Sequence, residues 1–119
     1  MSDCINIESI RKVAAEIADR FSPEQIVLFG SRATGTAQPD SDVDLLIVME
    51  YEGKSYRKAA EIRSSIQIQF AMDILVIRPT DYRIRLQEFD PIVVSAEREG
   101  IVLYERCSLL VSYKRCEIC

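Results

Sequence analysis

Two neighbouring stretches, FGSRATG at residues 29–35 and SDVDLLIV at residues 41–48, determine how this chain is expected to fold. The second contains two aspartates, Asp42 and Asp44, and then an unbroken apolar run that ends at Met49. A short continuous apolar run is typical of a strand that enters a core. Side chains two residues apart on a strand project from the same face. The pattern therefore predicts two carboxylates side by side at the mouth of a buried strand.

Periodicity and punctuation residues predict helices and strands on both sides of this segment. Apolar residues recur at helical spacing over residues 5–21, and Asp90 followed by Pro91 is typical of a helix start. Gly100 occupies the position after a helix that glycine favours. We expect helices at residues 5–21, 31–35 (one turn), 54–68, from Thr80 or Asp81 to about Glu88, and 91–99, and strands at 26–29, 43–49, 72–77 and 101–104.

This order of elements predicts an α/β (α+β) fold, a small mixed β-sheet flanked by helices. The domain is expected to span residues 1–105, and residues 106–119 are expected to form a tail. The tail contains Cys107, Cys116 and Cys119. A zinc site needs four ligands, and the chain has no histidine to supply the fourth, so reduced thiols are expected.

Length, charge and missing residue types exclude several classes of function. The 119 residues suffice for one domain. Nineteen acidic and fifteen basic residues give a net charge of −4, so stable nucleic-acid binding by this chain alone is not expected. The absence of histidine excludes Ser-His-Asp catalysis. There is no membrane-length apolar run and no secretory signal, so we expect a cytoplasmic protein.

The carboxylates are the first candidates for chemistry. Asp42 and Asp44 would repel each other, and a divalent cation removes that penalty. Mg²⁺ prefers one or two carboxylates together with water and substrate phosphates. Asp73 lies in a further apolar strand, residues 72–77. If this strand neighbours residues 43–49, Asp73 can face the pair, and three carboxylates can hold two metal ions suited to in-line displacement at phosphorus.

The segment before the aspartates has the features of a phosphate-binding turn. Gly30 allows the backbone to approach an anion closely. The helical turn expected after it presents backbone N–H groups to a phosphate. The Ser31 hydroxyl can donate a hydrogen bond to the same group, and Arg32 adds positive charge.

Gly30-Ser31, the Asp42-x-Asp44 pair and Asp73 on a later strand together resemble the DNA polymerase β-type nucleotidyltransferase superfamily. The small size is similar to its minimal nucleotidyltransferase branch, which includes antitoxins paired with HEPN-domain toxins. The likeness extends from about residue 5 to residue 105. It implies the polymerase β-like nucleotidyltransferase fold and an enzyme that uses two Mg²⁺ ions, with ATP as the nucleotide donor.

The resemblance also implies roles for individual residues. The metal-binding and catalytic residues would be Asp42, Asp44 and Asp73. The nucleotide phosphates would be bound by Gly30, Ser31 and Arg32. Asp73 would additionally help to deprotonate the attacking hydroxyl.

The function implied by the resemblance is transfer of a nucleoside monophosphate, AMP from ATP, to a hydroxyl of a partner HEPN toxin. A tyrosine would be the acceptor, and the modification would silence the toxin. Two other functions stay open. The chain could be a binding module that neutralises its partner by direct contact. It could also modify an aminoglycoside-like small molecule, in which case a homo-oligomer would have to supply the acceptor pocket.

Overall fold

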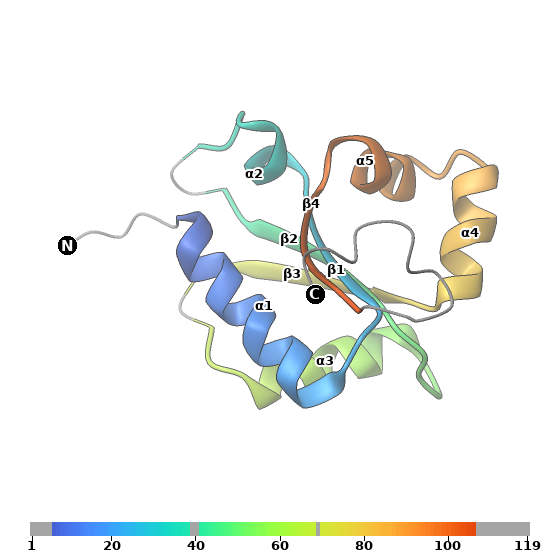
Figure 1. The fold of residues 1–119 in the computed structure, drawn as a ribbon, viewed down its shortest axis with the longest axis horizontal. Helices are drawn as coiled ribbons and strands as arrows, with labels where there is room; N and C mark the ends of the chain where they lie inside the picture. Colours follow the sequence, from blue (N-terminus) through green and yellow to red (C-terminus); the bar gives the residue numbers. More distant parts are fainter. Residues whose placement is uncertain (1–5, 39–40, 69, 107–119) are drawn as a thin grey trace.

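The computed structural model describes residues 6–38, 41–68 and 70–106 (Figure 1). The expected α/β architecture is confirmed. In chain order the elements are α1 (Ile7–Phe21), β1 (Gln25–Phe29), α2 (Ser31–Thr34), β2 (Val43–Val48), α3 (Ser55–Ser65), β3 (Met72–Ile77), α4 (Pro79–Gln87), α5 (Pro91–Glu99) and β4 (Ile101–Glu105).

The strands form a mixed sheet with the order β3-β2-β1-β4. β1 pairs antiparallel with β2 and with β4, whereas β2 and β3 are parallel. The C-terminal end of β1 therefore meets the N-terminal ends of β2 and β3. In this register Asp44 lies opposite Phe29 on one side and opposite Asp73 on the other.

Helices cover both faces of the sheet (Figure 1). α1 and α3 pack on one face, where Ile17 and Ile62 join Leu45 and Ile47 of β2 in a core cluster. α4 and α5 lie on the other face, where Val93 packs with Leu46 and Val48. Because successive β2 side chains enter opposite cores, the apolar run is continuous rather than alternating.

Local chemistry explains several helix ends. The Asn6 side chain accepts a hydrogen bond from the backbone N–H of Ser9 (2.8 Å) and starts α1. The Asp90 carboxylate accepts from the backbone N–H of Ile92 (2.9 Å) and of Val93 (3.3 Å), so the predicted start of α5 is confirmed.

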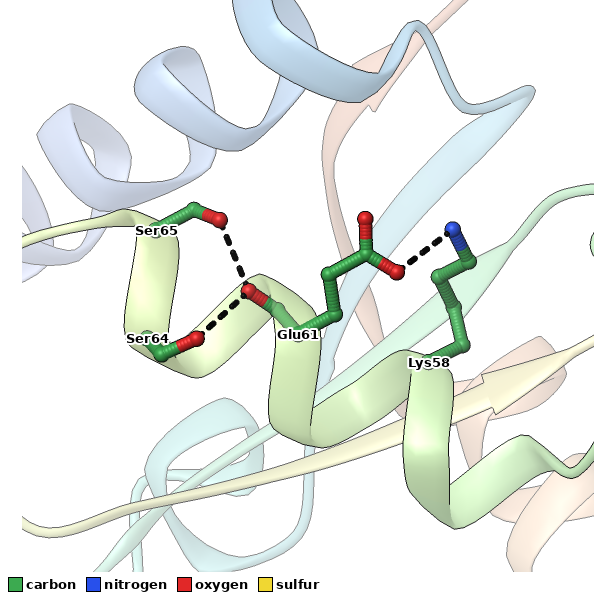
Figure 2. Close-up of polar contacts among 4 residues, drawn as sticks. All are labelled: Lys58, Glu61, Ser64 and Ser65. Carbon is green, nitrogen blue, oxygen red and sulfur yellow. Dashed lines mark hydrogen bonds and ion pairs between the residues drawn. The ribbon is translucent and has the colours of Figure 1, made fainter.

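The sequence-based boundaries of α3 and α4 were wrong. α3 ends at Ser65 rather than at residue 68. The hydroxyls of Ser64 and Ser65 both donate to the Glu61 carbonyl (3.1 and 2.8 Å), as Figure 2 shows, and such bonds compete with continued helical pairing. α4 begins at Pro79, after Arg78 as its N-terminal cap, and not after Thr80 or Asp81. Proline fits the first helical position because its missing N–H would have no helical acceptor.

Gly100 follows α5 as expected, but for a different reason. Its φ of −74° is extended rather than left-handed. A Cβ at this position would lie 2.4 Å from the Ala96 carbonyl oxygen and 2.5 Å from Cγ1 of Val27. Glycine is therefore needed because the chain passes close to α5 and β1.

The C-terminal tail is described only at its first residue. The backbone N–H of Arg106 donates to the Glu24 carbonyl (2.8 Å). Cys107, Cys116 and Cys119 lie outside the described residues, so the expectation of reduced thiols stays a prediction. Among the helices of the described ranges, none has the length and apolar character needed to cross a bilayer.

Candidate active site

The three aspartates singled out in the sequence come together at one end of the sheet. Asp44 and Asp73 are directly opposite each other on the parallel strands β2 and β3. Their side chains share the sheet face that carries α4 and α5, because their strand neighbours pack against α1 and α3 on the other face. Asp42 directly precedes β2. The condition set in the sequence analysis, that the two aspartate-bearing strands are neighbours, is met.

Electrostatic coupling links the three carboxylates. The pKa of Asp44 is raised above its ordinary value, first because the group is partly desolvated, then because of the charge of Asp73 and that of Asp42. Asp42 and Asp73 are exposed, whereas Asp44 is half-buried. A cation at this end of the sheet would relieve the repulsion.

The donor set suits Mg²⁺. Within residues 6–38, 41–68 and 70–106, no three carboxylate or thiol side chains are already gathered tightly enough to enclose a metal ion. The aspartates are thus neighbours rather than a closed cage. Mg²⁺ does not require such a cage, because it keeps several waters and binds one or two carboxylates together with substrate phosphates. Asp42, Asp44 and Asp73 would hold it from the protein side.

Gly30 brings the backbone close to Asp44. It lies directly after β1, with a φ of +79° that favours glycine. A Cβ on this residue would lie 2.5 Å from Oδ2 of Asp44. The sequence predicted that Gly30 admits a close anion, and the anion that the structure places there is the carboxylate of Asp44.

Ser31 begins the single turn of α2, which Figure 1 shows beside the N-terminal end of β2. The backbone N–H groups of Ala33 and Thr34 donate to the Gly30 carbonyl (3.0 and 3.2 Å). The first N–H groups of any helical turn precede these bonds and have no acceptor within the turn. Ser31 therefore has a backbone N–H without an acceptor in the turn, and it directly follows Gly30, which borders Asp44.

Arg32 points toward the loop that leads into β2. Its Nη2 donates to the Ser41 carbonyl (2.8 Å) and to the Gln38 carbonyl (3.4 Å), and its Nε also donates to Ser41 (3.3 Å). From the sequence, Arg32 is expected to contact a phosphate. In the structure its guanidinium binds the peptide unit directly before Asp42.

Arg63 was missed by the sequence analysis. It lies on α3, and its guanidinium donates to the Met72 carbonyl, directly before Asp73. No local pattern could have indicated this contact, because Arg63 reads as one more charge on a solvated helix face. Only the packing of α3 beside β3 brings it to the site.

The fold is shared with solved nucleotidyltransferases and toxin–antitoxin proteins. A protein described as a candidate nucleotidyltransferase from Sulfolobus solfataricus is 22% identical, with a TM-score of 0.57 over 82% of this chain and 78% of that one. A toxin–antitoxin structure with AMP-PNP is 19% identical (TM-score 0.51, 81% and 73% covered). A mutant of the toxin–antitoxin MntA–HpeT is 15% identical (TM-score 0.50, 86% and 75% covered).

No curated protein sequence matches the chain significantly. The family comparison is decisive, because the model of the nucleotidyltransferase domain matches residues 10–103, which include the Gly30-Ser31 turn and all three aspartates. The chain belongs to the nucleotidyltransferase domain family and is a nucleotidyltransferase.

Proposed function

We propose that this protein transfers AMP from ATP to a tyrosine hydroxyl of a HEPN-domain toxin and thereby acts as its antitoxin in the cytoplasm. The observation that carries the proposal is the position of Asp44. It lies directly opposite Asp73 and borders the Gly30 turn. Its pKa is raised by desolvation and by the charges of Asp73 and Asp42. Three carboxylates that form no ion pair with another described residue, beside a glycine turn, suit the binding of a cation together with an anionic ligand.

The residues divide the work of one displacement. The Gly30-Ser31 turn would bind the β- and γ-phosphates, and Asp42, Asp44 and Asp73 would hold two Mg²⁺ ions. When bound, the ions would supply positive charge that offsets the charge developing on the phosphates. The acceptor oxygen forms a bond to the α-phosphorus, and the bond from that phosphorus to the bridging oxygen breaks. Pyrophosphate leaves, and the hydroxyl proton passes to the carboxylate of Asp73.

A protein acceptor is favoured by what the domain contains. Every helix and strand of the described residues belongs to the sheet, to one of its two helical layers or to the candidate site, so none of them forms a separate segment for binding an acceptor. Two of the structural neighbours are toxin–antitoxin proteins, and one of them was solved with the ATP analogue AMP-PNP. These neighbours support a toxin as the partner that brings the acceptor surface.

Intact-mass spectrometry tests the proposal directly. The product of the gene adjacent to that of this chain is incubated with the protein, Mg²⁺ and each of the four nucleoside triphosphates in turn. An Asp42→Asn/Asp44→Asn double variant is the control. We expect a mass increase equal to one or more AMP units with ATP, and none with the double variant.

Two results would change the proposal in different ways. An increase with another nucleotide would correct the donor and keep the reaction. A stable complex without any mass increase would show that the chain neutralises its partner by contact alone.

A further inference from the structure

Two arginines from different helices make the same kind of contact beside the candidate site. Arg32 of α2 donates to the carbonyl of Ser41, the residue before Asp42. Arg63 of α3 donates to the carbonyl of Met72, the residue before Asp73. Each guanidinium therefore binds the backbone carbonyl directly before one of the site aspartates.

Asp42 and Asp73, which follow the two carbonyls bound by these arginines, are constrained less by strand pairing than Asp44 is. Asp44 lies within β2, which has β1 on one side and β3 on the other, and its side chain borders Gly30. Asp42 precedes β2 and follows a loop. Asp73 lies on β3, at the edge of the sheet. Strand pairing alone thus fixes Asp44 from both sides but leaves the other two less constrained.

The geometry of β3 explains why the Met72 carbonyl is available to Arg63. The Ala71 carbonyl accepts from the N–H of Val43 on β2 (3.0 Å), so the next carbonyl, that of Met72, points away from β2. That outer edge faces α3, which supplies Arg63 to Met72 and the Ser55 hydroxyl to the Val76 carbonyl (2.6 Å). Side chains of α3 thus supply the hydrogen-bond donors that a further strand would have supplied along the outer edge of β3, including the donor to the residue before Asp73.

α3 is itself anchored, so a donor on it has a defined position. Lys58 pairs with Glu61 (3.0 Å), as drawn in Figure 2, and its ammonium lies 5.7 Å from the centre of the Phe21 ring on α1. Ile62, adjacent to Arg63, is fully buried in the core between α1, α3 and the sheet.

We propose that Arg32 and Arg63 are positioning residues, which hold Asp42 and Asp73 so that both carboxylates converge with Asp44 on the cation that accompanies the nucleotide. This inference rests on the proposed function. It assigns Arg32 to the aspartate loop instead of to a phosphate. A guanidinium suits the task because its planar fork gives two donors to one carbonyl region in a fixed orientation.

The test measures Mn²⁺ binding by electron paramagnetic resonance, in the presence of a non-hydrolysable ATP analogue. The variants are Arg32→Gln and Arg63→Gln. Arg78→Gln is the matched control, since Arg78 also donates to a backbone carbonyl, that of Tyr51 (3.1 Å), at the opposite end of the sheet. Substitution of residues that orient metal ligands typically weakens metal binding by about 10- to 100-fold.

We expect Arg32→Gln and Arg63→Gln each to weaken Mn²⁺ binding by roughly tenfold or more, with Arg78→Gln unchanged. Affinity for the analogue without divalent cation should not change in any variant. Arg32→Lys and Arg63→Lys, which keep a donor and pack with less disturbance, should recover part of the loss. Thermal melting of every variant shows whether it is folded.

The possible failures are distinguishable. Wild-type affinity for Mn²⁺ in both glutamine variants would overturn the inference and leave the proposed function intact. Loss of analogue binding without cation in Arg32→Gln would return Arg32 to a phosphate contact and also overturn its positioning role. If the wild-type protein itself binds no Mn²⁺ with the analogue, the proposed function fails, and the inference fails with it.

Discussion

At the scale of single residues, the Asp44 carboxylate is needed for the proposed function but lowers the stability of the folded protein when no cation is bound. Its pKa in the folded protein is raised above the ordinary value of 3.8, so the folded state holds its proton more tightly than the unfolded state. Between 3.8 and the folded pKa, rising pH removes the proton from the unfolded chain first, and stability falls. At neutral pH the ionised carboxylate therefore opposes folding when no cation is bound.

Asp44→Asn should consequently stabilise the protein while abolishing nucleotidyl transfer. Removal of a partly desolvated charge, and of its repulsion by Asp73 and Asp42, corresponds to a rise in Tm of about 1–3 °C at pH 7 without divalent cations. As the pH falls below 3.8 the gain should vanish, because Asp44 becomes protonated in both the folded and the unfolded state. Thermal melting followed by circular dichroism measures both effects, and a lower Tm for Asp44→Asn at pH 7 would contradict this reading.

Gly30 offers a second test, with a matched control. Gly30→Ala places a methyl group 2.5 Å from Oδ2 of Asp44 in a backbone with φ of +79°, whereas Gly53→Ala meets φ of +84° in open space. Gly53→Ala should lose about 1 kcal/mol of unfolding free energy because of its positive φ. Gly30→Ala should lose more, because its φ of +79° with a ψ of −158° is a backbone conformation essentially limited to glycine and its new methyl group meets Asp44. Only Gly30→Ala should also lose transfer activity, by more than about tenfold, because Asp44 must move. Urea unfolding and initial rates separate the two losses, and equal activity losses would refute the special role of Gly30.

At the scale of elements, α5 depends on its first residue. Asp90 caps the helix through the N–H groups of Ile92 and Val93. Asp90→Ala should lower the unfolding free energy by about 1 kcal/mol, and Asp90→Asn should retain most of the stability. Urea unfolding measures the loss, and unchanged transfer rates are expected because α5 contributes no residue to the site. A loss as large in Asp90→Asn as in Asp90→Ala would show that charge, rather than the cap, matters.

Elements with a local chemical marker could be predicted from the sequence, and the others only in part. Asp90-Pro91 marks a helix start by capping and by the fixed φ of proline, so α5 was predictable. Pro79 is ambiguous, because it can close a strand or occupy the first turn of a helix, and α4 begins there. Gly100 was placed correctly for the wrong reason, since its close contacts with Ala96 and Val27 arise from tertiary packing.

At the scale of the whole molecule, the site could be predicted in its residues but not in its assembly. Asp42 and Asp44 are near each other in any strand, whereas the position of Asp73 depends on β3 pairing with β2 in one register. That register follows from burial of both sheet faces, which no short segment encodes. The contacts of Arg32 and Arg63 could not be predicted either: each spans only nine residues, but each depends on the path of the irregular segment between its two partners.

The most direct test of the central claim is a crystal structure with Mn²⁺ and a non-hydrolysable ATP analogue, in which anomalous scattering locates the metal. We predict manganese bounded by the carboxylates of Asp42, Asp44 and Asp73, with the triphosphate against the Gly30-Ser31 turn. Manganese bound elsewhere, or a triphosphate seated away from that turn, would contradict it.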